Sequence, residues 1–418
     1  MLLTNSTHGY FGYSIVAKRV CQYLRQQGHD CIIFGLQTIG RVIEDELSNK
    51  NIPLFFHPWG ADALGHYLKA HKTDILISIL DLFQPGIEYL PRTVKEQKVV
   101  WAAHITTNHM PLSPFLVGPI KEADVAIVPS KFGLQVLREA GFTGPDIFQI
   151  SHGVDTKFFS PLSGEEREEI RRKLGVLDKS TILLCVARNK GGVKNYPDLF
   201  KAWKLALGNI PNLKKEGILL VLSYPEEPEG VRIDHLRNLM GLQNHVKFIW
   251  AKPTSDWSSV EPTYEGDANG FPHQPNWGFD EKNMRKIYGL ADCMIFSTQA
   301  ESFCFPVIES AAMGIPSIAP NHTVFPELIG EPKAGLLADI KMATTIPLLS
   351  DIFNVDPISL AGCIAQLYED ENLRKELGKN ALENTRQYGW DRILPRWAEV
   401  VERFGVPPCD YSKGTLGV

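Results

Sequence analysis

Two glutamates, Glu301 and Glu309, flank a short apolar run in the segment ESFCFPVIES, residues 301–310. We expect Glu301 in a loop after a strand, and Glu309 in the first turn of a helix that Pro306 helps to begin. Between the glutamates lie backbone N–H groups with no obvious acceptor, which suit a polyhydroxylated or anionic ligand. These N–H groups belong to Ser302, Phe303, Cys304 and Phe305. Two carboxylates beside such donors suit sugar recognition. The alternative is that Glu309 only complements the helix dipole and Glu301 is solvated.

A second group of candidates lies in VARNKGGVKNYPDLFKAW, residues 186–203, which predicts a strand, a loop and a helix. Arg188 is expected at the end of the strand and Lys194 at the entrance of the helix. A guanidinium fork and a compact ammonium together suit a diphosphate. Gly191 and Gly192 would let the backbone approach it closely. The alternative is a pair of solvated loop cations.

A weaker signal lies near the N-terminus, in THGYFGYSIVAKRV, residues 7–20. This stretch predicts a glycine-containing loop that opens a helix, with Gly9 and Gly12 small enough to admit a phosphate. Gly12 is therefore a further candidate ligand-binding residue.

The elements that must position these residues alternate along the chain as short apolar runs and longer helical patterns. The first series of strand-like runs comprises 74–80, 99–105, 124–130 and 147–154. The second comprises 181–187, 217–223, 245–250, 293–298 and 316–320. Runs that are apolar on both faces and separated by helices indicate parallel sheets covered on each side. We predict an α/β chain with two doubly wound, Rossmann-like domains. Ligands then bind beyond the carboxyl ends of the strands.

The boundary between the domains is expected in HGVDTKFFSPLSGEE, residues 152–166, where a Pro/Ser/Gly segment follows a strand. We predict an N-terminal domain over 1–155 and a C-terminal domain over 156–388. A helical segment over 389–418 is expected to return to the N-terminal domain, with a break or kink at Pro395. Residues 251–280 are rich in Pro, Gly and Trp and show neither period, which predicts a long irregular insertion.

Composition limits the classes of partner and compartment. The net charge of −5 gives no global basic field, so a nucleic-acid ligand is disfavoured. The seven cysteines are scattered and include no C-x-x-C, which indicates reduced thiols in a cytoplasmic protein. The N-terminus lacks the pattern of a signal peptide. No apolar run approaches the roughly 20 residues of a membrane span. Peripheral contact with the inner membrane face remains open.

Several segments occur in an order that is found in one family. ARNKGGVKN is followed by LADCMIFSTQAESFCFPVIESAAMGIPSIAP, then by FPELIG and AGLL. In the first half, STHGYFGYSIVAKRVCQYLRQQGHD precedes ADVAIVPSKFGLQVLREAG and ISHGVDTKFFSP. The later set resembles the carboxy-terminal domain of family-4 retaining glycosyltransferases, which have the GT-B fold. The earlier set resembles the glycine loop, the first helix and two further segments of the same family, so the resemblance covers nearly the whole chain.

The resemblance implies roles for individual residues. Glu301 would contact the transferred sugar, and Glu309 the ribose hydroxyls of a nucleotide sugar. His104, at the end of VVWAAHI, stands where the family commonly carries a histidine beside the reacting sugar. His109 is a competitor, because a slip of the alignment would exchange the two, and a structural role for either stays open. Independently of the resemblance, Asp81 at the end of the strand DILISIL is a weaker candidate for facing the acceptor.

The sequence also departs from the family. Its loop usually reads E-G-F-G, whereas Ser302 and Cys304 stand in place of the glycines. His152 replaces the usual Asn, and the 251–280 insertion is not part of the common pattern. The identities of donor and acceptor are therefore not transferable from the family.

Taken together, these features predict transfer of a sugar, with retention, from a nucleotide-diphosphate sugar to an acceptor hydroxyl in an interdomain cleft. The acceptor class, whether glycan, lipid-linked or small molecule, stays open. No D-x-D occurs anywhere, so we expect no metal and no cofactor, with Arg188 and Lys194 neutralising the leaving diphosphate. Two alternatives remain: a catalytically silent nucleotide-sugar-binding protein, and an NAD-type oxidoreductase. GYFGYS lacks the G-x-G-x-x-G of the latter.

Overall fold

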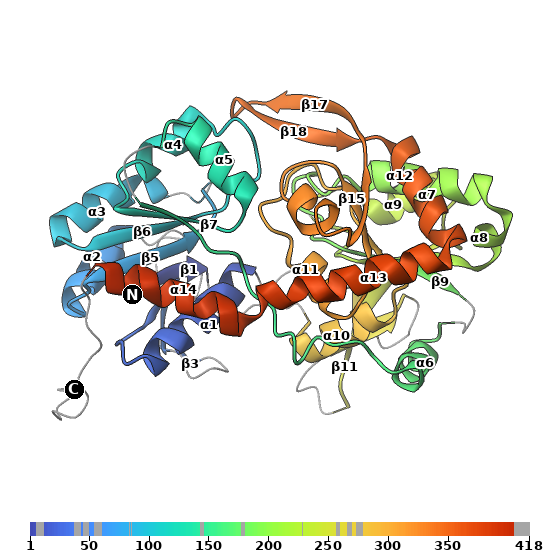
Figure 1. Ribbon diagram of the computed structural model, residues 1–418, viewed down its shortest axis with the longest axis horizontal. Helices are drawn as coiled ribbons and strands as arrows, with labels where there is room; N and C mark the ends of the chain where they lie inside the picture. Colours follow the sequence, from blue (N-terminus) through green and yellow to red (C-terminus); the bar gives the residue numbers. More distant parts are fainter. Residues whose placement is uncertain are drawn as a thin grey trace. The chain divides into compact units, whose positions relative to one another are not determined.

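The computed structural model describes residues 1–5, 12–36, 43–44, 50–53, 61–82, 84, 86–142, 146–176, 180–227, 229–255, 260–265, 270–272 and 279–404. The chain divides into two compact units, each with a sheet of its own (Figure 1). Unit 1 comprises Met1–Gly153, Pro347–Ser350 and the segment from Gly389 onward. Unit 2 comprises Val154–Ile346 and Asp351–Tyr388. The first division thus falls just before the position predicted from the sequence.

The sheet of unit 1 has the strand order β3-β4-β2-β1-β5-β6-β7-β8 and is parallel except between β3 and β4. Its strands are β1 (Leu2–Asn5), β2 (Ile33–Leu36), β3 (Ile43–Glu44), β4 (Lys50–Pro53), β5 (Ile75–Leu80), β6 (Val100–Ile105), β7 (Val125–Val128) and β8 (Asp146–Gln149). Its helices are α1 (Gly12–Gln26), α2 (Ala61–Ala70), α3 (Leu90–Gln97), α4 (Pro114–Ile120), α5 (Lys131–Glu139) and α14 (Trp390–Arg403), with a 3-10 turn at Ile87–Tyr89.

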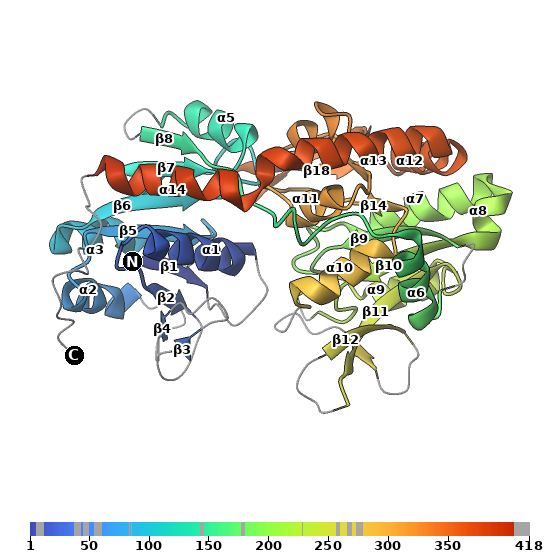
Figure 2. The same cartoon turned by 60° about the horizontal axis from the view of Figure 1, so that its bottom comes forward.

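The two faces of this sheet carry different helices. Apolar side chains of α2, α3, α4 and α5 form one core with Trp101, Ala103 and Ile105 of β6. Because successive side chains of a strand point to opposite faces, His104 points to the other face. There its ring lies against Trp397 of α14. Helices α1 and α14 lie side by side (Figures 1 and 2).

Helix α14 overturns one of the two outcomes predicted for Pro395, because it continues through the proline without a break. A proline removes one backbone hydrogen bond from a helix interior. Here the buried apolar stripe of Ile393, Trp397 and Val401 continues on both sides of the proline and holds the helix to the unit. The expected break therefore does not occur.

The sheet of unit 2 has the order β12-β11-β10-β9-β14-β15-β16, with β13 beside β11, and is parallel from β11 to β16. Its strands are β9 (Thr181–Val186), β10 (Gly217–Leu222), β11 (Val246–Pro253), β12 (Val260–Tyr264), β13 (Phe271–Pro272), β14 (Cys293–Ile295), β15 (Ser317–Pro320) and β16 (Gly335–Ala338). A separate two-stranded ribbon joins β17 (Ile340–Ile346) and β18 (Ser350–Val355).

The helices of unit 2 cover both faces of its sheet. They are α6 (Gly164–Lys173), α7 (Tyr196–Asn209), α8 (Pro211–Glu216), α9 (Ile233–Leu239), α10 (Glu281–Gly289), α11 (Phe305–Ala312), α12 (Pro357–Glu369) and α13 (Glu371–Thr385), with short turns at Pro326–Gly330 and Arg386–Tyr388. Leu183 and Cys185 of β9 face the core formed with α7, α8, α9 and α12. Ile182 and Leu184 face the core formed with α10 and α11. The alternation explains why β9 is apolar on both faces.

The stretch over 251–280 is another correction. It was expected to be irregular, yet β11 continues to Pro253, and β12 and β13 pair with it in antiparallel fashion. Pro262 lies opposite Ala251 in this pairing. Prolines are tolerated at the edge of a sheet, where a missing N–H costs no ladder bond, so their abundance hid the strands.

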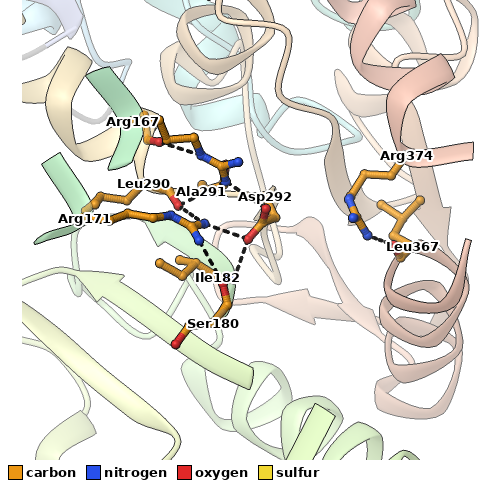
Figure 3. Close-up of polar contacts among 10 residues, drawn as sticks. Arg167, Arg171, Ser180, Ile182, Leu290, Ala291, Asp292, Leu367 and Arg374 are labelled. Atoms are coloured by element: carbon orange, nitrogen blue, oxygen red, sulfur yellow. Dashed lines mark hydrogen bonds and ion pairs between the residues drawn. The ribbon is translucent and has the colours of Figure 1, made fainter. Parts of the chain in front are cut away.

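A cluster of charged groups fastens α6 to unit 2 at the amino ends of β9 and β14 (Figure 3). Asp292 accepts hydrogen bonds from Arg167 Nη2 at 2.7 Å, Arg171 Nη2 at 2.9 Å and the backbone N–H of Ile182 at 2.8 Å. Arg171 also donates to the carbonyl oxygen of Leu290 at 2.7 Å. Burial alone would raise the pKa of Asp292, but the two guanidinium groups outweigh it and lower that pKa.

Candidate active site

The loops that follow β9 and β14 leave the same edge of the sheet, because these two strands are parallel neighbours. Backbone and side-chain bonds lock the loops together. Ser297 Oγ lies 2.9 Å from the carbonyl oxygen of Lys194 and 3.0 Å from that of Asn195. The N–H of Gln299 donates to the carbonyl oxygen of Val193 at 2.8 Å. Cations from one loop and carboxylates from the other are therefore held within reach of each other.

Lys194 and Glu301 meet directly in an ion pair between these loops. Their side chains are 24% and 16% exposed, so the pair is shielded but reachable from solvent. Burial by itself lowers the pKa of Lys194, and the attraction of Glu301 outweighs it and raises that pKa. The ammonium is therefore charged at neutral pH and available to a competing anion.

Arg188 lies in the same loop as Lys194 and is the more exposed cation, at 42%. Its Nη2 is 3.4 Å from Oε1 of Glu227, a carboxylate that is 7% exposed and follows β10. Oε2 of Glu227 is buried and has no hydrogen-bond partner in the part of the chain that the structure describes. Glu227 was not predicted from the sequence, where it is one of several glutamates in EEPEG.

The neighbouring Asn189 fixes the shape of this loop. Its Nδ2 donates to the carbonyl oxygen of Val231 at 2.6 Å, and its Oδ1 accepts from the N–H of Val231 at 3.0 Å. Gly191 and Gly192 both have positive φ, at 63° and 72°. Glycine adopts this left-handed backbone without a steric penalty. The loop can thus turn sharply between Arg188 and Lys194.

The loop that carries Glu301 ends at Cys304, whose φ of 71° lies in the left-handed region. The family resemblance placed a glycine at this position, and the backbone angle gives the physical reason. The N–H groups of Ser302 and Cys304 have no acceptor among the described residues. The side chain of Phe303 is buried against Phe305 and Tyr388, so only its backbone faces the loop. Burial raises the pKa of the Cys304 thiol, which stays protonated.

Glu309 corrects a further expectation, because it is the fifth residue of α11 and lies outside the first turn. The helix already begins at Phe305, which moves Glu309 beyond the N-terminal N–H groups and weakens the helix-dipole alternative. Its Oε2 accepts a hydrogen bond from the Tyr288 hydroxyl at 2.5 Å. Burial raises the pKa of Glu309 to about 7, while this hydrogen bond acts to lower it.

The histidine candidates lie in unit 1. His104 is 2% exposed, and its Nε2 is 3.2 Å from Nε2 of His152. Burial lowers the pKa of His104 to about 3, and burial and His104 lower that of His152 well below its ordinary value. His109 follows β6 in a loop, and burial lowers its pKa as well. The two imidazoles therefore form a neutral pair, and the assignment of His104 over His109 stays a prediction.

The remaining candidates are placed only in part. Gly12 is the first residue of α1, and Gly9 lies outside the described residues. Asp81 directly follows β5 and is half-buried. Within the described ranges, no three His, Cys, Asp or Glu side chains gather as metal ligands. No helix in those ranges is both long enough and apolar enough to cross a membrane.

Comparison with known proteins identifies the fold and the family type. The model of the family "Glycosyl transferases group 1" matches residues 273–347, which contain Glu301 and Glu309. A D-inositol 3-phosphate glycosyltransferase of Corynebacterium glutamicum is 23% identical over 65% of this chain and 55% of its own length. The resemblance to the family-4 glycosyltransferases is confirmed. The match spans about half of that relative.

Solved structures extend the likeness over nearly the whole chain. The sucrose-phosphate synthase of Thermosynechococcus elongatus has a TM-score of 0.72 and 17% identity, and the likeness covers 97% of this chain and 98% of that one. Anabaena HepE in complex with UDP-glucose has a TM-score of 0.72 and 16% identity, with coverage of 96% and 99%. The fold is therefore GT-B, with two Rossmann-like domains. Arg188 and Lys194 lie outside the segment that matches the family model, so their assignment depends on the loop geometry.

Proposed function

We propose that the protein is a retaining glycosyltransferase that moves a sugar from a nucleotide-diphosphate sugar onto an acceptor hydroxyl. The observation that carries this proposal is the Lys194–Glu301 pair, held between two interlocked loops at the carboxyl edge of the unit 2 sheet. This arrangement offers a cation to the diphosphate and a carboxylate to the sugar within one site. HepE, which has the same fold, binds UDP-glucose, and this supports a nucleotide sugar as the donor.

In the proposed reaction, the bond between the anomeric carbon and the diphosphate oxygen breaks as the acceptor oxygen attacks on the same face. The acceptor proton passes to the departing phosphate oxygen. Negative charge develops on the diphosphate, and Arg188, Lys194 and the N–H groups of Ser302 and Cys304 stabilise it. Lys194 exchanges its carboxylate partner for phosphate, which leaves Glu301 to accept a sugar hydroxyl. Glu309 accepts the ribose hydroxyls.

We further propose that the reaction needs no divalent metal, because side-chain cations take the role of the ion. The test is turnover of UDP-, GDP- and ADP-sugars, beginning with UDP-glucose, before and after exhaustive chelation. The acceptor panel includes inositol phosphates, lipid-linked sugars and glycans. Turnover should survive EDTA. Loss on chelation and recovery with manganese or magnesium would reject the metal-free mechanism. Binding without turnover for every acceptor would favour a silent binding protein.

Substitutions separate the proposed roles. Arg188→Ala and Lys194→Ala should each lower turnover by more than about tenfold, because each removes a charged hydrogen-bonding partner of the diphosphate. Lys190→Ala is the matched control, because Lys190 lies in the same loop and pairs only with the exposed Glu229 among the described residues. Equal losses in all three variants would point to a general effect on the loop.

The two glutamates should respond differently. Glu309→Ala should weaken the nucleoside diphosphate and the intact donor alike, by roughly 1.5–3 kcal/mol. Glu301→Ala should chiefly lower turnover. His104→Ala should reduce turnover while sparing nucleoside diphosphate affinity, and selective loss in His109→Ala would show that His109 is the relevant residue. Wild-type activity in both glutamate variants would reject the site.

A further inference from the structure

Tyr288 is a fully buried phenol beside the candidate donor site. It lies in the last turn of α10 and is 0% exposed. Its ring packs edge-on against Phe159, with centroids 6.1 Å apart. Its hydroxyl donates to Oε2 of Glu309 at 2.5 Å. Buried phenols require a hydrogen-bond partner, so this contact fixes both side chains.

The contact leaves Glu309 with one oxygen unused. Oε1 of Glu309 has no hydrogen-bond partner in the ranges that the structure describes, and the side chain is only partly buried. An ionised carboxylate can accept several hydrogen bonds at its two oxygens. One oxygen is therefore anchored from inside the protein, and the other is available to a ligand that approaches from the sheet edge.

We propose that Tyr288 is a positioning residue for donor binding, which holds Glu309 by Oε2 and directs Oε1 toward the ribose hydroxyls of the nucleotide. This inference rests on the proposed function, which assigns the ribose to Glu309. It adds a residue that neither the family resemblance nor the motif pattern assigned. Tyr288 itself does not contact the donor.

The electrostatic surroundings give this contact a measurable signature. Burial raises the pKa of Glu309 to about 7, the Tyr288 hydroxyl acts to lower it, and Glu281 of α10 acts to raise it. Cys304, in the loop before α11, acts to raise the pKa of Tyr288. The pKa of Cys304 is in turn raised by Glu301 and lowered by Lys194. Removing the hydroxyl should raise the pKa of Glu309 above its present value. A protonated Glu309 loses acceptor capacity for ribose.

The experiment is a pH series of nucleoside diphosphate binding, with UDP, GDP or ADP according to which binds the wild type. Calorimetric titrations of the wild type and Tyr288→Phe would run from about pH 5.5 to about pH 9. Wild-type affinity should fall below about pH 7, and the acid limb of Tyr288→Phe should move to higher pH. At pH 7 the variant should bind about tenfold more weakly. Titration of the ligand phosphate is common to both proteins and cancels in their ratio.

Tyr368→Phe is the matched control. The hydroxyl of Tyr368, on α12, donates to Glu216 of α8 at 2.6 Å, and neither residue belongs to the donor loops. It should leave the pH series unchanged. A Tyr288→Phe variant that melts earlier but keeps the wild-type pH midpoint would overturn the inference and leave Tyr288 a structural residue. In that event Glu309→Gln would still abolish the acid limb.

A second measurement separates this inference from the proposed function. The titration of the Glu309 carboxyl, followed by carbon NMR with Glu309→Gln to assign the signal, needs no ligand. A higher carboxyl pKa in Tyr288→Phe supports the coupling, and an unchanged one rejects it. If the wild type binds no nucleoside diphosphate, the proposed function and the ligand-directed role of Tyr288 both fail. If the wild type binds and only Tyr288→Phe shows no effect, the inference alone fails.

Discussion

A buried carboxylate, Glu227, pairs with one cation of the candidate diphosphate site. The side chain of Glu227 is 7% exposed, whereas that of Glu229, which pairs with Lys190, is 65% exposed. Both ion pairs connect the loop after β9 to the loop after β10, so they form a natural comparison. The geometry indicates that Glu227 orients the Arg188 guanidinium while leaving it accessible to a ligand.

Glu227→Ala should raise the KM for the donor by about threefold or more, because Arg188 loses the partner that restricts its rotamers. Glu229→Ala should leave KM unchanged. Steady-state kinetics with varied donor measures both. A fall of KM in Glu227→Ala would mean that the Glu227 charge opposes the diphosphate and does not orient Arg188.

The His104–His152 pair predicts a loss of stability in mild acid. Both pKa values are lowered in the folded state, so the unfolded chain binds more protons once the pH falls below about 6.5. Stability should therefore be complete above that value and decline as the pH falls toward about 3. In His152→Asn only His104 remains, and the slope should be shallower by up to about 1.4 kcal/mol per pH unit.

Hydrogen exchange of the β6 amides between about pH 6.5 and pH 5 measures this slope before most carboxylates titrate. Parallel slopes for the wild type and His152→Asn, with or without a constant offset, would contradict the prediction, because His152 would then bind protons equally in the folded and unfolded chain.

Residues of the candidate site differ in how far the sequence predicts them. Arg188, Lys194 and Glu301 follow apolar strands, and parallel neighbours bring their loops to one edge, so their proximity could be inferred. The turn position of Glu309 could not, because it depends on the first residue of α11, and helix boundaries shift with local capping. No sequence pattern predicts a role for Glu227 or Tyr288. Each contacts a residue that is distant in the chain, and the packing of the fold brings the two together.

At the scale of elements, the apolar runs predicted β5 to β11, β14 and β15, whereas β1, β2, β12 and β16 were not predicted. β5, β6, β9 and β10 are buried on both faces and therefore have continuous apolar sequences. β1 is only four residues long, and β12 contains a proline and a glutamate within five residues. β12 lies at the edge of its sheet, where a strand buries less surface and does not need a continuous apolar sequence.

The Asp292 cluster predicts how α6 is fastened. Asp292→Ala should lower the free energy of unfolding of unit 2 by about 3 kcal/mol, because it leaves the buried Arg171 without its charged partner. Glu169→Ala removes an exposed pair with Lys173 on the same helix and should have little effect. Chemical denaturation followed by hydrogen exchange in β9 and β14 measures the difference.

The sign of the pH dependence provides a second check on this cluster. The pKa of Asp292 is lowered in the folded state. Its contribution to the free energy of unfolding is therefore fully present when the pH lies above the ordinary pKa of an aspartate, and it is lost as the pH falls through the lowered pKa. The deficit of Asp292→Ala should therefore shrink in strong acid. A deficit that is constant with pH would indicate lost packing in place of lost charge.

At the scale of the whole molecule, the last described helix completes the first unit. Trp397 is fully buried against His104, and the ring of Trp390 lies so close to Gly153 that an added Cβ would come within 2.4 Å of it. Arg403 pairs with Asp146 at 2.6 Å. Apart from the short segment Pro347–Ser350, unit 1 is thus made of an N-terminal and a C-terminal part of the chain, and unit 2 lies between them in sequence.

Truncation at Gly389 should therefore damage unit 1, although unit 2 directly precedes the cut. Hydrogen exchange should accelerate in α1 and β6 and stay near its original rate in β9 and β10. Trp397→Ala tests the same point with the chain intact and should cost about 3–5 kcal/mol in unit 1. Faster exchange confined to unit 2 in either variant would contradict this assignment.

This discontinuity sets the order of events during synthesis. β6 emerges from the ribosome early, but α14, which packs against the face of β6 that carries His104, is translated only after unit 2 is complete. At ~5–20 residues per second, the His104 face would stay uncovered for roughly ten seconds or more. Domains usually fold in the order of their synthesis. Here the second unit can fold first, and the nascent first unit would expose apolar surface that a chaperone can bind in the interval.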